Sequence, residues 1–363
     1  MAEMVNGVAS YCDHVGLWRD ELRRWVPRRL FDAHVHLHPP AAMGPLSPER
    51  LREALGTFTS LEWETCVALY GQLFSGKEIA GLFAFPLPLR EARQIAANDY
   101  LIEIMKRDRR VHGFFLAHPT DPRPSIAAYE RSLATGVPFV GAKPYSDLIG
   151  KNNFKCVMTE FIPEGLLEFM EAKKLILMLH TSGMGVGDAE VRRYLRWMAG
   201  RFPSVKVVLA HMGRYVRAEQ FFDFLDSGLL EEFPNFFLDI SSASAPEVHE
   251  RFLRRESLWP RLLFASDLPF GLITGVERWS ETHGAIFVSR DHYPWSDPAM
   301  EAQFAEERRR LTYNVYHCIK ALKEAVERLG ISGAQAERLK EDIFSRNALS
   351  GVLGQPEQKG AAA

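Results

Sequence analysis

Four histidines and one aspartate stand at the ends of apolar runs in this sequence. His34 and His36 lie two residues apart in FDAHVHLH, His180 ends LMLH, His211 ends VVLAH, and Asp267 ends LLFASD. Imidazole nitrogens and carboxylate oxygens are ligands that zinc, manganese and iron(II) accept. A histidine alone at such a place is more often structural, but the five together predict a metal site if the fold brings them to one place.

The elements that would position these residues alternate along the chain. Short β-branched and aromatic runs are separated by longer segments with helical periodicity, which is the pattern of repeated βα units in a parallel sheet. The predicted strands are Leu30–Leu37, Gly81–Leu87, Val111–Ala117, Phe139–Tyr145, Leu175–His180, Val205–His211, Asn235–Ser241 and Leu262–Asp267. The predicted helices between them are Pro48–Phe74, Ala92–Arg107, Ser125–Ala134, Pro163–Lys173, Asp188–Arg201, Arg217–Leu225 and Pro246–Arg254.

Eight strands of this kind predict an α/β fold, a single (β/α)₈ TIM barrel, in which the carboxyl ends of the strands surround the active site. An open doubly wound sheet is the alternative, but it would require a glycine-rich phosphate turn after the first strand. We expect an N-terminal helical extension over residues 1–29, the barrel over 30–354 and a disordered tail over 355–363. Leu311–Leu329 and Gln335–Phe344 are predicted C-terminal helices, and Gly271–Pro298 is expected to be a long functional loop without a strand of its own.

Several segments together resemble the amidohydrolase superfamily, in particular the amidohydrolase-2 group of metal-dependent hydrolases and decarboxylases. FDAHVHLH, LMLHTSG, VVLAHMGRY and LLFASDLPFG resemble its signature segments, and VGAKPYSD and IFSRNALSGVLG resemble its fourth strand and terminal helix. The likeness extends from about Leu30 to Gly354. It is specific to the superfamily and to no particular substrate.

The resemblance implies that His34, His36, His180 and Asp267 bind one divalent metal ion, with zinc favoured over manganese and iron. Asp267 and His211 would be the catalytic residues. Asp267 would accept a proton from the attacking water, and His211 would stabilise the charge that develops on the substrate or transfer a proton.

Four further residues are predicted to contact the substrate. Lys143 stands on the fourth predicted strand, where some members with two metals have a carboxylated lysine, and we expect it to be unmodified beside one metal. Tyr145 and Arg214 could hold a substrate carboxylate, since arginine binds one bidentately. His118 ends the third strand, where it either lines the pocket or caps the strand.

Composition sets the wider expectations. The chain has 363 residues, 47% of them hydrophobic and 25% charged, with a formal net charge of −2, so a basic surface for nucleic acid is not expected. No apolar run is long enough to span a membrane. We therefore expect a cytoplasmic protein that acts on a small molecule, without nucleic acid or membrane as partners, and that could form a homo-oligomer.

Three functions remain open from the sequence. The first is hydrolysis of a C–O or C–N bond in a lactone, ester or amide, in a small substrate that bears a carboxylate. The alternative is a non-oxidative decarboxylase or related lyase that uses the same metal site. A barrel that binds without catalysis is less favoured, because it would be expected to lack one of the ligands.

Overall fold

The structure, a computed structural model, describes residues 4–5, 8–9, 14–280 and 284–355. Eight parallel strands form one sheet in which each strand pairs with its neighbours in sequence. The strands are β3 (Arg29–His36), β4 (Glu78–Phe85), β5 (Val111–Leu116), β6 (Gly141–Lys143), β7 (Ile176–Leu179), β8 (Lys206–Leu209), β9 (Phe236–Asp239) and β10 (Leu262–Leu263).

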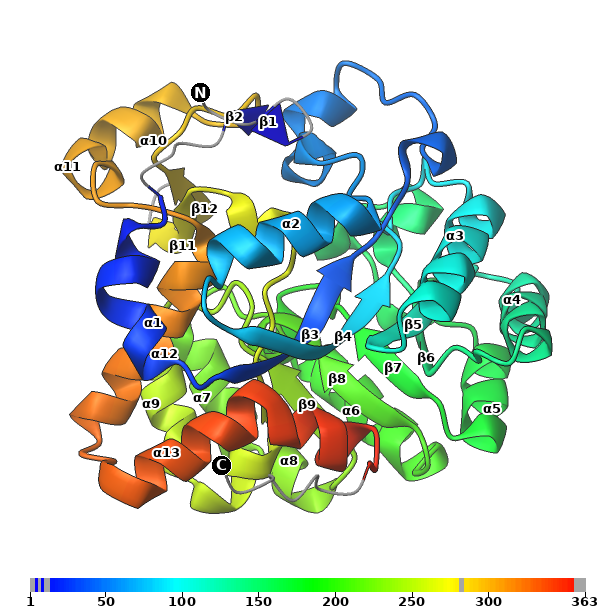
Figure 1. Cartoon of the computed structure of the whole chain (residues 1–363). Helices are drawn as coiled ribbons and strands as arrows, with labels where there is room; N and C mark the ends of the chain where they lie inside the picture. Colours follow the sequence, from blue (N-terminus) through cyan, green and yellow to red (C-terminus); the bar gives the residue numbers. More distant parts are fainter. Residues whose placement is uncertain (1–3, 6–7, 10–13, 281–283, 356–363) are drawn as a thin grey trace.

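The two ends of this sheet come together, so the sheet closes into a barrel. The N–H of Ala33 on β3 donates to the carbonyl of Phe264 at 2.9 Å, and the N–H of His36 donates to that of Leu268 at 2.7 Å. Figure 1 shows the strands in the centre with helices around them. The predicted (β/α)₈ barrel is confirmed.

Helices follow each of the first seven strands and pack on the outside of the barrel. They are α2 (Trp63–Leu73), α3 (Gln94–Arg107), α4 (Pro122–Ala134), α5 (Glu164–Lys173), α6 (Ala189–Arg201), α7 (Ala218–Asp226) with α8 (Leu229–Glu232), and α9 (Pro246–Leu253). Helix α6 buries Val191, Leu195 and Met198, which are spaced to lie on one face of the helix. The buried face of each helix therefore follows from its apolar spacing.

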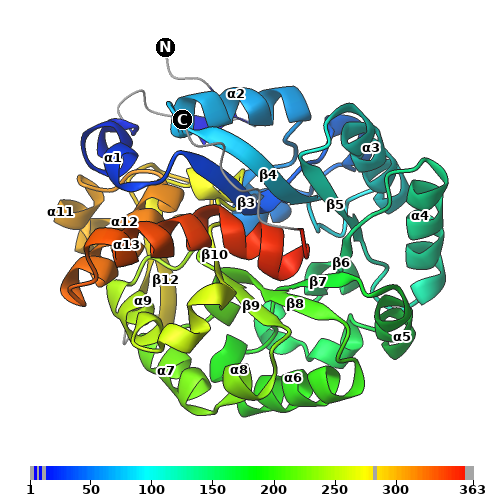
Figure 2. The same cartoon turned by 60° about the horizontal axis from the view of Figure 1, so that its bottom comes forward.

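A C-terminal helix closes the bottom of the barrel, opposite the carboxyl ends of the strands. After α12 (Asn314–Arg328) and α13 (Gly333–Glu341), the helix continues as η12 (Asp342–Val352), drawn in red across the strands in Figure 2. Ala348 and Val352 of η12 pack with the aromatic and aliphatic side chains of the barrel interior. The barrel is thus a packed core, and only its upper end is left for a site.

The predicted helix Pro48–Phe74 is wrong in its first half. The chain there forms short turns, η3 (Arg50–Arg52) and η4 (Ala54–Thr57), and α2 begins only at Trp63. Between η4 and α2, Leu61 pairs with His38 through two backbone hydrogen bonds of 2.9 Å. A side chain at Gly56 would have its Cβ 2.1 Å from the carbonyl oxygen of Arg50, so this tight turn requires glycine.

The expectation of a strand-free loop over Gly271–Pro298 is also wrong. The segment contains an antiparallel pair, β11 (Gly275–Ser280) and β12 (Gly284–Ser289). Val276 and Val288 face each other in this hairpin and form a small apolar cluster with Leu311. Neither strand alternates apolar and polar residues: β11 has the sequence GVERWS and β12 has GAIFVS, so the sequence lacks the pattern of a half-buried strand here. Helices α10 (Pro298–Gln303) and α11 (Ala305–Arg308) follow the hairpin.

The N-terminal segment is helical over η1 (Trp18–Leu22) and α1 (Arg23–Trp25), whereas β1 (Met4–Val5) and β2 (Val8–Ala9) pair as short strands. The tail predicted to be disordered lies, from residue 356 onward, outside the described residues. Within the described part of the chain, none of the helices combines the length and the apolar composition needed to cross a membrane.

Candidate metal centre

Three predicted ligands meet at the carboxyl end of β3. His34 and His36 extend from the same face of this strand, because side chains alternate along it, and their rings are 5.2 Å apart. The segment after β10 lies beside β3 and supplies Asp267. Asp267 Oδ1 is 3.3 Å from His34 Nε2 and 3.2 Å from His36 Nε2.

The other nitrogen of each ring is already engaged. His34 Nδ1 lies 2.9 Å from Asp239 Oδ2, and His36 Nδ1 lies 3.5 Å from the carbonyl oxygen of Pro86. A carboxylate and a carbonyl only accept hydrogen bonds, so both Nδ1 atoms carry the proton. Burial and the positive charge of Lys143 hold the pKa of both histidines well below the usual range, so the rings are neutral.

Two Nε2 lone pairs therefore face a buried carboxylate oxygen. Asp267 Oδ1 has no hydrogen-bond partner among the described residues, and the three atoms lie within 4.8 Å of one another. Such an arrangement is unfavourable unless a cation lies between them. Ligands about 2.0 Å from one tetrahedral ion lie roughly 3.3 Å apart. The donor set and its spacing therefore fit a zinc-like metal ion.

His211 lies beside this trio, with its ring 5.1 Å from that of His34. Its Nδ1 is 2.9 Å from Ser241 Oγ, whose hydroxyl in turn donates to Asp239 Oδ1. Because that hydroxyl donates its only proton to Asp239, it accepts from His211, and His211 Nδ1 carries the proton. Nε2 of His211 is thus left as the atom that can exchange a proton with a substrate.

His180 is close to the other histidines but outside the three-atom group. Its ring is 5.3 Å from that of His211 and 4.9 Å from that of Tyr145. Its buried Nδ1 has no hydrogen-bond partner among the described residues. His180 is therefore placed at the edge of the candidate metal centre with an available ligand atom.

Lys143 puts a buried positive charge beside the site. Its Nζ lies 4.5 Å from the centre of the Phe85 ring, and among the described residues no carboxylate lies within 4 Å of it. Burial lowers the pKa of Lys143 to about 8, although the charges of Asp267 and Asp239 act in the opposite direction. Burial likewise raises the pKa of Asp267 to about 7, with Asp239 adding to the rise and His211 and Lys143 opposing it.

The backbone around the site is strained. Asp267, His211, Arg214 and Ser242 have φ values of 55°, 59°, 58° and 55°. This left-handed conformation costs roughly 1–2 kcal/mol for a non-glycine residue. These four residues come after strands β8, β9 and β10, which end at the candidate metal centre. Backbone strain of this kind is typical of functional sites.

Arg214 and His118, both predicted to contact substrate, have partners within the protein. Arg214 Nη1 donates to the carbonyls of Gly183 at 2.7 Å and Thr181 at 3.3 Å, so it holds the loop after β7. His118 Nδ1 accepts from the N–H of Asp121 at 3.0 Å, just before α4. Of the two readings of His118, the structure therefore favours the cap.

Three residues that contribute to the site, Asp239, Ser241 and Asp32, were not singled out in the sequence. Asp239 and Ser241 follow β9 and orient the histidines as described above. Asp32 accepts from the N–H groups of His34 and Ser266, at 3.2 and 2.8 Å, and so ties β3 to the segment that holds Asp267. Glu277 of β11 lines a cavity of about 340 Å³ that also reaches Ser242. Polar residues at the end of each strand, one after another, were the signal for Asp239 and Ser241.

Glu277 is solvent-exposed and lines this cavity from the hairpin. The cavity lies between the loops that follow β8 and β9 and the hairpin, and Tyr215 and Ser244 line it as well. None of the proposed metal ligands or catalytic residues is among the residues that line it.

Comparison with known proteins gives one family. The amidohydrolase profile matches residues 82–350. An amidohydrolase 2 from Bifidobacterium longum subsp. infantis is similar in structure, with a TM-score of 0.51 and 14% identity over 91% of this chain and 100% of that one. At this identity the likeness shows the fold alone.

Two other solved structures are more distant. A 4-oxalomesaconate hydratase from Rhodopseudomonas palustris has a TM-score of 0.43 and 17% identity over 83% of this chain and 99% of that one. A 2,6-dihydroxybenzoate decarboxylase, solved with 2,6-dihydroxybenzoate, has a TM-score of 0.46 and 14% identity over 89% of this chain and 98% of that one. None of the curated proteins compared with the chain matches it.

Proposed function

The chain belongs to the amidohydrolase family, whose members of this kind are metal-dependent enzymes, and we propose that it hydrolyses a C–O or C–N bond of a small substrate. The substrate classes that we propose are a lactone, an ester or an amide that bears a carboxylate. The observation that supports this most is the pair of neutral Nε2 atoms, of His34 and His36, that face the unpartnered oxygen of Asp267. We propose His180 as a further ligand.

A divalent ion at this place would supply Lewis acidity and make water nucleophilic at neutral pH. Asp267 is placed to accept the proton of the attacking water, because its carboxylate is the only acidic group of the trio. His211 Nε2 can accept a proton and return it to the leaving group, while Ser241 and Asp239 hold its Nδ1–H in place.

The buried ammonium of Lys143 would stabilise negative charge on the substrate, either a carboxylate or the oxygen of the attacked carbonyl group. Its low-polarity surroundings strengthen this interaction relative to water. The same feature supports a second proposal, a non-oxidative decarboxylase, because Lys143 could hold a substrate carboxylate without any attack by water.

Product analysis separates the two reactions. Lactones, esters, amides and aromatic or unsaturated carboxylic acids are incubated with the enzyme in water enriched in oxygen-18. The hydrolase proposal expects one heavy oxygen in the product and no carbon dioxide. Carbon dioxide release without heavy oxygen in the organic product would contradict it and support the decarboxylase. Metal-loaded His211→Asn is the control, and it is expected to lose turnover while keeping its metal.

A further inference from the structure

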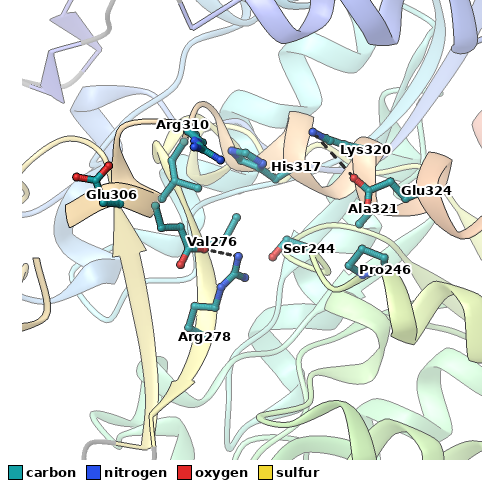
Figure 3. Close-up of a pocket in the computed structure, with 12 residues that line it drawn as sticks. Ser244, Pro246, Val276, Arg278, Glu306, Arg310, His317, Lys320, Ala321 and Glu324 are labelled. Atoms are coloured by element: carbon teal, nitrogen blue, oxygen red, sulfur yellow. Dashed lines mark hydrogen bonds and ion pairs between the residues drawn. The ribbon is translucent and has the colours of Figure 1, made fainter. Parts of the chain in front are cut away.

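A second cavity, of about 460 Å³, lies outside the barrel mouth on the far side of the hairpin. β11 contributes Val276 and Arg278 to its wall, the start of α9 contributes Pro246, and α12 contributes His317 and Lys320 (Figure 3). Its volume is in the range of small-molecule sites. None of the proposed ligands or catalytic residues lines it, so the proposed reaction leaves it without a role.

This outer cavity adjoins the cavity that Glu277 and Ser242 line. Ser244 and Arg278 line both cavities. Both side chains are labelled in Figure 3. A ligand in the outer cavity is therefore either a separate small molecule or one end of a longer molecule that also enters the neighbouring cavity.

The charges on the wall leave one arginine unpaired. Each lining glutamate has a basic partner: Glu307 pairs with Arg278, Glu306 with Arg309 at 3.0 Å, and Glu324 with Arg328 at 3.4 Å and Lys320 at 4.0 Å. Among the described residues, no carboxylate lies within 4 Å of the Arg310 guanidinium. Arg310 thus brings an uncompensated positive charge to the cavity.

His317 adds a hydrogen-bond donor at the same place. Its Nε2 accepts from the N–H of Thr312 at 3.0 Å, so the neutral ring carries its proton on Nδ1. Burial, together with the positive charges of Lys320 and Arg278, lowers the pKa of His317 to about 4, so the ring is neutral at pH 7. Arg310 and His317 both line this cavity, and both are labelled in Figure 3.

We infer that the outer cavity binds an oxyanion, a carboxylate or a phosphate, between the guanidinium of Arg310 and the Nδ1–H of His317. A guanidinium presents parallel N–H groups that match two oxygens of either anion. A neutral imidazole can donate a third hydrogen bond to one of the anion's oxygens. This site goes beyond the proposed reaction and does not depend on it.

Calorimetric titration of the full chain with inorganic phosphate and with glutarate tests the inference. Arg310→Gln is expected to weaken binding of at least one anion about tenfold, because it removes the charge and the bidentate donor. Arg310→Lys keeps the positive charge but lacks the paired N–H groups of arginine. Its affinity for the anion is therefore expected to lie between those of the wild type and Arg310→Gln. The matched control is Arg193→Gln, since Arg193 is an exposed arginine of α6 that does not line the cavity. Equal affinities in wild type and Arg310→Gln, or no binding of either anion, would overturn the inference.

A longer diacid, pimelate, distinguishes the two sources of the anion. If the anion is the far end of a substrate, pimelate affinity falls both in Arg310→Gln and after metal removal by a chelator. If it is a separate ligand, the dependence on Arg310 is unchanged by the chelator. Both results support an oxyanion site. Because the experiment measures binding and not turnover, its outcome does not depend on whether the proposed hydrolysis is correct.

Discussion

At the level of single residues, the Asp239 carboxylate accepts hydrogen bonds from two sides of the candidate metal centre. Its Oδ2 faces His34 Nδ1, and its Oδ1 accepts from the N–H of His211 and from the N–H and hydroxyl of Ser241. One carboxylate therefore sets the proton position on a proposed metal ligand and, through Ser241, on the proposed catalytic histidine. Such supporting contacts raise metal affinity by orienting the ligand ring.

Asp239→Asn should therefore weaken metal binding by about 10- to 100-fold. An amide cannot accept on both sides, so its NH₂ group faces either His34 Nδ1 or the backbone N–H groups of His211 and Ser241. The measurement is competition for zinc with a coloured chelator. The control is Ser241→Ala, which removes the contact to His211 but none to His34, and should keep the metal while lowering turnover. Unchanged zinc affinity in Asp239→Asn would contradict the assignment.

The site residues that could be predicted from the sequence are those that stand at the ends of apolar runs. His34, His36, His211 and Asp267 could be predicted to meet because parallel strands end at one edge of a barrel. Asp239 could not be assigned a role in the same way, because its importance lies in hydrogen bonds to residues 28 and 205 positions away. Long-range pairing of this kind leaves no local pattern in a sequence.

At the level of elements, the loops above the barrel are joined by Arg50. This buried side chain, 2% exposed, belongs to η3 after β3. Its Nε donates to Glu91 at 2.8 Å, in the loop after β4, and its Nη2 donates at 2.6 Å to Asp147, which follows β6. Three loops that surround the candidate metal centre are thus held by one guanidinium.

Arg50→Met should lower the free energy of unfolding by roughly 3 kcal/mol, because Asp147 and Glu91 would lose their buried counter-charge. The measurement is urea denaturation followed by circular dichroism. Arg52→Met is the control. Arg52 is 64% exposed at its side chain and pairs with Glu49 at 3.8 Å, so its loss should cost less than about 0.5 kcal/mol. Equal losses in the two variants would show that Arg50 does not hold the loops.

Regular helices with a clear apolar face, such as α6 and α12, could be predicted from the sequence almost to their ends. The segment before α2 could not, because its turns depend on pairing between Leu61 and His38 and on the tight turn at Gly56. The hairpin of β11 and β12 could not be predicted either, because its strands do not alternate apolar and polar residues. In the segment after it, Tyr293 and Trp295 stack on each other, and Trp295 Nε1 donates to Thr57 Oγ1 at 2.7 Å.

At the level of the whole molecule, closure of the barrel keeps several histidines neutral. Burial lowers the pKa of His38, His112 and His249 from 6.5 to about 4. In the unfolded chain these rings take up a proton near pH 6.5, whereas in the fold they do so only near pH 4. The free energy of unfolding that depends on keeping these rings neutral is therefore fully present above pH 6.5. It is lost as the pH falls from 6.5 towards 4, because the unfolded chain binds protons there and the folded chain does not.

His249 allows this linkage to be measured away from the metal. His249 Nε2–H donates to the carbonyl of Ala243 at 2.7 Å, a contact that the side-chain amide of glutamine can replace. As the pH falls from 6.5 to 4, the wild type should lose free energy of unfolding relative to His249→Gln, because only the wild type has the buried neutral ring. This loss is about 1.4 kcal/mol per unit of pKa difference between the two states. Urea denaturation across this pH range tests it, and a difference independent of pH would contradict the buried neutral ring.

The central claim is that His34, His36 and Asp267 hold one divalent metal ion. Elemental analysis of protein purified without chelators tests it most directly, with His34→Ala/His36→Ala as the control variant. We predict about one zinc, manganese or iron ion per chain in the wild type and a loss of that metal in the control. No metal in the wild type, even after reconstitution, or equal metal content in a folded control variant, would contradict the account.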